Sequence, residues 1–216
     1  EIVLNGVDLE RFNPGPKSKD LLQSLGVPSN TPTVGIVAML RPEKGHDIFL
    51  KAAALVLKQK PETHFLIIGD GDERKKLEGM AEDTSIKAYI HFLGARKDIP
   101  EILNLFDVAV LSSYPVVETL SNAVLEYMAA GKPVVSTRVG SLEEVVDEGQ
   151  TGFLVEPGDF EAMAVRILKI LQDAKLAREM GEAGRKKVEK EYSIEQMVSL
   201  TESLFEKLLL EKKGRA

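Results

Sequence analysis

The chain has 216 residues, of which 44% are hydrophobic and 29% charged, an ordinary balance for a globular protein with a core. Its formal net charge of −6 argues against a nucleic-acid binder, which normally has a basic surface, but allows a nucleotide, whose diphosphate needs only local cations and backbone N–H groups. The sequence has no cysteine, which excludes disulfides and thiolate chemistry and fits a reducing, cytoplasmic location.

The N-terminal stretch predicts a linker rather than a domain. The chain opens on EIVLNGVD, without an initiating Met or a basic signal region, which favours a piece of a longer protein. Residues 1–33 are rich in proline, glycine and asparagine. We expect them to form a linker-derived segment with one short helix, Asp20–Leu25, that packs on the domain behind it. Apolar runs such as Phe65–Ile68 are too short to cross a bilayer.

From residue 34, short β-rich runs alternate with longer amphipathic stretches. The expected strands are Val34–Leu40, His64–Ile68, Tyr89–Leu93, Val108–Leu111, Pro133–Ser136 and Gly152–Val155. The expected helices between them are Lys44–Gln59, Asp72–Glu82, Ile99–Phe106, Ser121–Ala130 and Leu142–Glu148. This alternation implies βαβ units, so we expect an α/β fold, a Rossmann-like doubly wound parallel sheet of about six strands with helices on both faces.

Beyond Asp159 the pattern is all helical. The expected helices are Asp159–Ala174, Ala177–Glu191 and Ser193–Lys212. The last one carries apolar residues at helical spacing, most simply a core stripe: Met197, Leu200, Leu204, Phe205 and Leu208. We therefore divide the chain into the segment 1–33, a main domain at 34–192 and a C-terminal helix at 193–216.

Two acids lie between the fourth and fifth expected strands. Glu118 is in the loop after Leu111, and Glu126 follows eight positions later, inside the helix that opens at Ser121. In an open α/β sheet, ligands bind where strands end, and a helix N-terminus favours a phosphate. Asn122 and Glu126 share one helix face, and an ionised acid accepts hydrogen bonds from sugar hydroxyls. The alternative is that both acids are merely solvated.

Cations and glycines follow the first two strands. Arg41 and Lys44 lie at an expected helix start, where the dipole disfavours cations unless an anion lies between them; surface charge is the alternative. Gly69-Asp70-Gly71 closes the second strand, but Arg74 stands where a dinucleotide fingerprint has its third glycine. A nicotinamide-type Rossmann site is therefore disfavoured. The three histidines have no metal-ligand spacing, and we expect no metal.

The stretch ETLSNAVLEYMAAGKPVVST, with Glu118 and Glu126, closely resembles the E-x7-E signature of the family 4 retaining glycosyltransferases, which have the two-domain GT-B architecture. Four further stretches resemble the same family in the right order: NGVDLERFNP, LRPEKGHDIFLKA, FLIIGDGDERKKLE and VGSLEEVVDEGQTGFLVEPGD. The resemblance covers nearly the whole chain. It matches only the C-terminal, donor-binding half of such an enzyme, so the N-terminal half is expected as a partner domain.

The resemblance implies a role for each candidate residue. It implies that Glu118 holds hydroxyls of the donor sugar, that Glu126 takes the ribose hydroxyls, and that Lys44 pairs with the diphosphate. Backbone N–H groups at Leu120, Ser121 and Asn122 would receive the phosphate nearest the sugar. The base would lie by Gly69 and the loop Gly94–Asp98, touched by Arg96 largely through backbone atoms. The donor is a nucleoside-diphosphate sugar, and no cofactor is implied.

Two departures from the family pattern stand out. The family usually places a second phosphate-binding cation five residues before the lysine, at the position of Met39 here, and Arg41 is the candidate substitute. Glu118 is followed by Thr-Leu-Ser-Asn rather than a glycine-containing turn, so Ser121 is a candidate helix cap.

Several alternatives stay open at this point. They are a GT-B sugar-nucleotide epimerase, a non-catalytic nucleotide-sugar-binding module and a purely structural domain. The isolated domain is expected to transfer no sugar, because half of the cleft is absent. In the family architecture the C-terminal helix at 193–216 is expected to contact the missing N-terminal half, which would leave part of its apolar stripe exposed here and favour self-association. Membrane association through the other half is a further alternative. The sugar, the base and the acceptor cannot be read from these residues.

Overall fold

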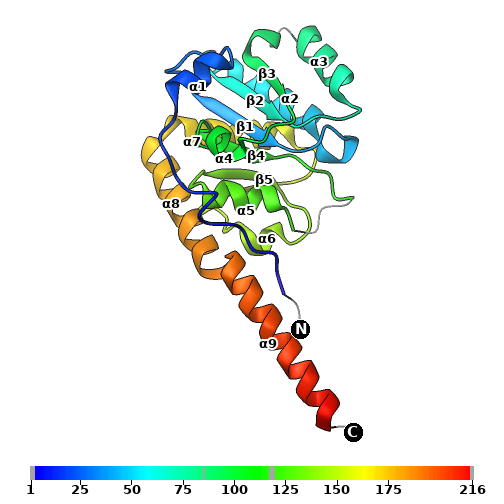
Figure 1. Cartoon of the computed structure of the whole chain (residues 1–216). Coiled ribbons are helices and arrows are strands. Elements are labelled where there is room, and N and C mark those ends of the chain that lie inside the picture. Colours follow the sequence, from blue (N-terminus) through cyan, green and yellow to red (C-terminus); the bar gives the residue numbers. More distant parts are fainter. Residues whose placement is uncertain (1–2, 85, 117–119, 215–216) are drawn as a thin grey trace.

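The computed structural model describes residues 3–84, 86–116 and 120–214, with side chains as far as Leu210. Its centre is a six-stranded sheet in the order β3-β2-β1-β4-β5-β6, and every neighbouring pair is parallel (Figure 1). The strands are β1 Thr33–Val37, β2 His64–Ile68, β3 Ile90–Gly94, β4 Val108–Leu111, β5 Val134–Thr137 and β6 Gly152–Val155. All six strands expected from the sequence are present.

Helices connect the strands and then close the chain. The α-helices are α1 Lys19–Ser24, α2 His46–Leu57, α3 Arg74–Asp83, α4 Ile99–Leu103, α5 Asn122–Ala129, α6 Leu142–Val145, α7 Phe160–Gln172, α8 Ala174–Glu191 and α9 Ile194–Gly214. Two 3-10 turns, η1 Pro42–Lys44 and η2 Lys87–Tyr89, precede α2 and β3.

Helices cover both faces of the sheet, because alternate strand residues point to opposite sides. In β2, Phe65 and Ile67 pack in the core beneath α2, α3 and α7. Leu66 and Ile68 pack in the second core, beneath α1, α4, α5 and the C-terminal part of α8. The strands are buried on both sides, which is why they read as continuous apolar runs. The expected doubly wound α/β fold is confirmed.

Some boundaries differ from the expected ones. β1 ends at Val37 rather than Leu40, because the Leu40 N–H bonds to the Asp70 carbonyl and the chain turns across the sheet edge. The helix expected from Lys44 is interrupted by Gly45, whose φ of 62° is left-handed, so that α2 starts at His46, two residues later than expected. α8 starts at Ala174, earlier than expected, because the Asp173 carboxylate caps it.

Much of the apolar stripe on the last helix is exposed, so the simple core stripe is wrong there, whereas the partial exposure expected from the family architecture is observed. α9 extends away from the sheet (Figure 1), and Leu200, Phe205 and Leu208 are 48–62% exposed. Met197 stays close to the domain, where its sulfur accepts the Gly6 N–H at 3.3 Å. The helix start at Ser193 is confirmed, since its hydroxyl accepts the Gln196 N–H.

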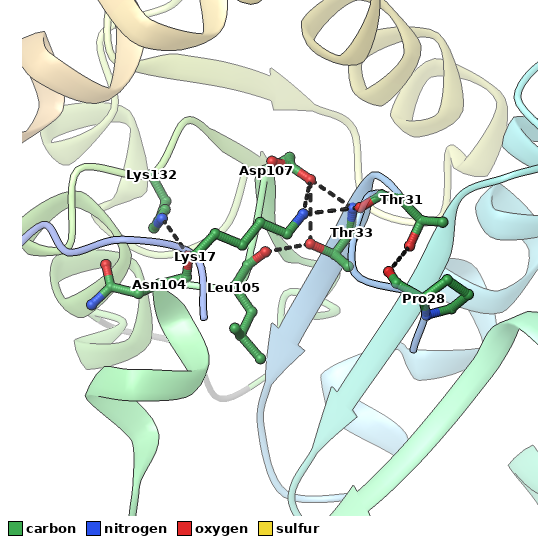
Figure 2. Close-up of polar contacts among 8 residues, drawn as sticks. All are labelled: Lys17, Pro28, Thr31, Thr33, Asn104, Leu105, Asp107 and Lys132. Atoms are coloured by element: carbon green, nitrogen blue, oxygen red, sulfur yellow. Dashed lines mark hydrogen bonds and ion pairs between the residues drawn. The ribbon is translucent and has the colours of Figure 1, made fainter. Parts of the chain in front are cut away.

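The N-terminal segment is fastened to the edge at which the strands begin (Figure 2). The Lys17 ammonium donates to the Asp107 carboxylate at 2.6 Å and to the Thr31 carbonyl at 3.0 Å. The same carboxylate accepts the Thr33 N–H at 2.7 Å, and the Thr33 hydroxyl donates to the Leu105 carbonyl. These bonds join the segment to the first residues of β1 and β4.

Two further cations extend this attachment. Lys132 donates to the Asn104 carbonyl at 3.1 Å, and burial lowers the pKa of its ammonium to about 8. The Asn104 side chain in turn accepts the Gly15 N–H at 2.8 Å. Arg185 of α8 donates to the Phe12 and Ala129 carbonyls, both at 2.7 Å, so it links the N-terminal segment to the end of α5.

Candidate functional site

The turn after β1 carries the two candidate cations at the edge where the strands end. Arg41 precedes η1 and is 4.0 Å from Glu43, with a half-exposed side chain. Lys44 ends η1, and α2 follows directly after Gly45. The cations therefore stand on a 3-10 turn before the helix, rather than on the first helical turn that the sequence predicted.

Hydrogen bonds tie this turn to the segment after β4. The Ser112 hydroxyl donates to the Lys44 carbonyl at 3.0 Å, and the Tyr114 N–H donates to the Glu43 carbonyl at 2.8 Å. The backbones approach so closely that a Cβ at Gly45 would lie 2.0 Å from the Ser112 carbonyl oxygen. Lys44 is thus held beside the chain that leads to Glu118, although Glu118 itself lies outside the described residues.

Helix α5 presents the second acid. Ser121 occupies its N-cap position, but its side chain makes no cap hydrogen bond, so that expectation is wrong. Among residues 3–84, 86–116 and 120–214, we see no acceptor for the N–H groups of Leu120, Ser121 and Asn122. As far as the described residues show, these donors lie without a partner at the positive end of the helix dipole.

The two faces of α5 divide as the sequence predicted. Val124, Tyr127 and Met128 are fully buried against the sheet, and the Tyr127 hydroxyl accepts the Val37 N–H at 2.7 Å. The opposite face carries Asn122 and Glu126. Leu120 is half-buried against the same core as α5.

Glu126 and Asn122 line a cavity of about 190 Å³ between α5, the N-terminal segment and the start of α9. Its walls also include Gly6, Val7, Asp8, Arg11, Phe12, Leu125 and Ile194. Burial raises the pKa of the Glu126 carboxyl, and the nearby positive charge of Arg11 acts against that rise. Within the described part of the chain, the Glu126 carboxylate has no hydrogen-bond or ion-pair partner. A half-buried carboxylate without a donor is costly, so this cavity suits a ligand rich in hydroxyl groups.

The ends of β2 and β3 form a third part of this edge. The Gly69 N–H donates to the Gly94 carbonyl at 2.9 Å, and a Cβ at Gly69 would lie 2.0 Å from the Ala38 carbonyl oxygen. Beyond Gly94, the Arg96 guanidinium makes two hydrogen bonds, 2.8 and 2.6 Å long, to the Asp98 carboxylate. This pair fixes the shape of the loop and lowers the pKa of Asp98.

The comparison with known families decides which one the chain represents. The family model described as Glycosyl transferases group 1 matches residues 17–187. The chain belongs to this family.

Relatives of the glycosyltransferase chain agree with this assignment. The D-inositol 3-phosphate glycosyltransferase of Corynebacterium urealyticum is 32% identical over 182 residues, which are 80% of this chain and 43% of that protein. The crystal structure of Anabaena HepE in complex with UDP and glucose has a TM-score of 0.86 and 27% identity, over 96% of this chain and 56% of that one. The chain spans about half the length of the curated relatives it matches.

A solved structure of a single domain is also similar. The C-terminal domain of LpcC, a glycosyl transferase group 1 family protein of Francisella tularensis, has a TM-score of 0.79 and 28% identity, over 88% of this chain and 100% of that one. The glycosyltransferase chain is therefore a C-terminal, Rossmann-like GT-B domain, as the resemblance implied.

Two negative findings apply to the described residues of this glycosyltransferase domain. They contain no group of three or more His, Cys, Asp or Glu side chains that could hold a metal ion. None of their helices combines the length and apolar character required to traverse a bilayer.

Sequence reasoning missed several residues around this glycosyltransferase site. Ser112 and Tyr114 were not connected with Lys44, because their contacts join loops that are distant in sequence. Asp8 and Arg11 line the Glu126 cavity, and the only signal for them was their place within NGVDLERFNP. His46, at the start of α2, is 2% exposed, and both its ring nitrogens lack a partner among the described residues.

The burial of His46 predicts a pH-dependent stability. Burial lowers its pKa to about 4 in the folded state, against about 6.5 in an unfolded chain, so the unfolded state binds more protons between these values. Stability from this group is therefore complete above about pH 6.5 and is lost as pH falls towards 4. We expect His46→Leu to remove about 2 kcal/mol of the stability difference between pH 7 and pH 5, measured by urea unfolding. An unchanged difference would contradict the assignment.

Proposed function

We propose that the chain is the donor-binding half of a retaining glycosyltransferase, which moves a sugar from a nucleoside-diphosphate sugar to a glycan, lipid or small-molecule acceptor. The observation that carries the proposal is the half-buried Glu126 carboxylate, which has no hydrogen-bond partner within the described ranges and shares a small cavity with Asn122. A carboxylate of this kind accepts hydrogen bonds from the paired hydroxyls of a ribose. The relative HepE, which was crystallised with UDP and glucose, supports the same ligand class.

The diphosphate would be held by Lys44 and by the N–H groups at the start of α5. Lys44 is fixed by the segment after β4, and Leu120, Ser121 and Asn122 retain N–H donors. As the sugar–phosphate bond breaks, negative charge grows on the leaving diphosphate, and preorganised donors stabilise that charge without reorganising. Arg41 is the second cation on the same turn, half-exposed and only 4.0 Å from Glu43. We assign Arg41 the role of the second phosphate-binding cation, which the family usually has at the position of Met39.

The remaining residues would contact the other parts of the donor. Glu118 holds the transferred sugar in this proposal, from the loop after the Ser112–Tyr114 segment. The base lies at the ends of β2 and β3 in this proposal, where Gly69 lets the Ala38 carbonyl pack closely and the Arg96–Asp98 pair fixes the loop. With Lys44, Arg41 and the N–H groups at the start of α5 around the diphosphate, the donor needs no metal ion for charge stabilisation. The expected location of the protein in this proposal is the cytoplasm.

The exposed apolar residues of α9 suit a contact with the other half of the enzyme. Leu200, Phe205 and Leu208 lie on the part of the helix that leaves the domain (Figure 1). Because the acceptor side of the cleft lies outside this chain, we expect the isolated domain to bind nucleotide weakly and to transfer no sugar. The same residues would favour self-association of the isolated domain.

A thermal-shift panel with UDP, GDP, ADP and their sugar conjugates tests the proposal. One of the nucleotides at 100 times its dissociation constant should raise the melting temperature by about 5–10 °C, because a ligand that binds only the folded state adds about 2.7 kcal/mol. Glu126→Gln, which keeps the side-chain size and removes the charge, should abolish most of this shift. The absence of a shift with every nucleotide would favour a structural domain. Binding without transfer by the complete protein would favour a non-catalytic module.

A further inference from the structure

Arg11 and Glu126 line the same small cavity. Both side chains line this space of about 190 Å³, yet the guanidinium and the carboxylate form no ion pair. The Arg11 guanidinium lies over the Phe12 ring, 5.0 Å from its centroid, and in the described part of the chain it makes no hydrogen bond or ion pair. Opposite charges in one cavity would normally pair, so their separation leaves an acceptor and a donor facing a common space.

The backbone of Arg11 is fixed in this position. The Asp8 carboxylate accepts the Arg11 N–H at 2.8 Å and the Glu10 N–H at 3.1 Å, which closes a tight turn. Phe12 is buried, and its N–H bonds to the Asp8 carbonyl at 2.9 Å. Arg11 therefore projects from a rigid turn.

Arg185 fastens that turn to the helix that carries Glu126. Its guanidinium donates to the Phe12 carbonyl and to the Ala129 carbonyl, three residues beyond Glu126 on α5. These bonds set the position of the Arg11 backbone relative to α5 before any ligand arrives. Such preorganisation reduces the ordering cost of binding.

We propose that Arg11 is a further donor-binding residue, which donates a hydrogen bond to a ribose hydroxyl oxygen while Glu126 accepts hydrogen bonds from the ribose hydroxyls. A hydroxyl group has one proton to give and lone pairs to receive, so a vicinal diol satisfies the acid and the guanidinium together. A deoxyribose, which lacks one of these groups, does so less well. This assignment rests on the proposed function, and it adds the N-terminal segment to the binding site.

The test is isothermal titration of the 216-residue chain with the nucleoside diphosphate that gives the largest thermal shift, and with its 2′-deoxy and 3′-deoxy forms. Arg11→Met should weaken binding of the ribonucleotide about tenfold, the loss of one hydrogen bond to a charged group. For at least one deoxy form, the loss should be less than about threefold, since the partner hydroxyl is already absent. Arg11→Lys, which keeps the charge but not the planar fork, should restore part of the affinity.

Arg178→Met is the matched control, because it removes the same charge from an exposed side chain of α8. It should leave all three affinities unchanged. If Arg11→Met behaves like this control while Glu126→Gln still weakens binding, the inference about Arg11 is overturned and the proposed function stands. If the wild-type chain binds none of the nucleotides, both are overturned. An equal loss for the ribonucleotide and both deoxy forms would also contradict the assignment.

Discussion

Lys44→Ala will lower kcat of the complete glycosyltransferase about 10²–10³-fold, equivalent to about 2.7–4 kcal/mol of barrier. The reason is that Lys44 is the preorganised cation expected to meet the charge that develops on the leaving diphosphate. Its turn is already held by Ser112 and Tyr114, so the positive charge needs no reorganisation when the bond breaks. Steady-state kinetics with the preferred nucleotide sugar, using the protein that contains both halves, measures the effect.

Lys58→Ala provides the control for the loss of a positive charge. Lys58 is exposed at the end of α2, away from the edge where the strands end. This variant should keep kcat and KM within about twofold of wild type, as surface substitutions usually do. Near wild-type turnover of Lys44→Ala would refute the role given to Lys44, whatever the control shows.

Gly45→Ala will destabilise the domain by about 3 kcal/mol or more. An alanine would be strained at a φ of 62°, and its Cβ would lie 2.0 Å from the Ser112 carbonyl oxygen, a backbone atom that cannot rotate away. The turn that carries Lys44 must then separate from the segment after β4. Urea unfolding should show the loss of stability, and titration should show weaker binding of the nucleoside diphosphate.

Gly26→Ala separates the cost of the left-handed backbone from the cost of the clash with the Ser112 carbonyl. Gly26 has a φ of 74°, but a Cβ there meets no atom within 4 Å, so only the left-handed backbone is penalised, by about 1–2 kcal/mol. The additional loss in Gly45→Ala reports the close approach of the two loops. Equal losses of stability in the two variants would show that the contact with Ser112 is unimportant. Unchanged nucleotide binding in Gly45→Ala would show that the turn carrying Lys44 is not part of the binding site.

The sheet could be predicted from sequence because each strand is short, apolar and flanked by turn residues. Val108–Leu111 and Gly152–Val155 have the boundaries that their sequence patterns predict. The end of β1 could not be predicted, because Met39 and Leu40 continue the apolar run while the chain turns across the sheet edge. That turn depends on hydrogen bonds to the loop after β2, which local sequence does not reveal.

The candidate site was predictable only where its residues are close in sequence. Asn122 and Glu126 share a face because of helical spacing, and the structure has them on one cavity wall. Arg11 was not predicted, because more than a hundred residues separate it from Glu126 and only tertiary packing brings the two together. The roles given to Lys44 and Arg41 stay predictions.

The two edges of the sheet differ in how completely their charges are neutralised. At the start of the strands, Lys17, Thr33 and Asp107 satisfy one another, which favours the folded chain with or without a ligand (Figure 2). At the other edge, the Glu126 carboxylate is half-buried and has no hydrogen-bond partner among the described residues, which penalises the empty domain. The domain should therefore resist heat and proteases better when nucleotide is bound. Substitutions that neutralise Glu126 should raise the stability of the nucleotide-free domain and reduce the stabilisation that nucleotide adds.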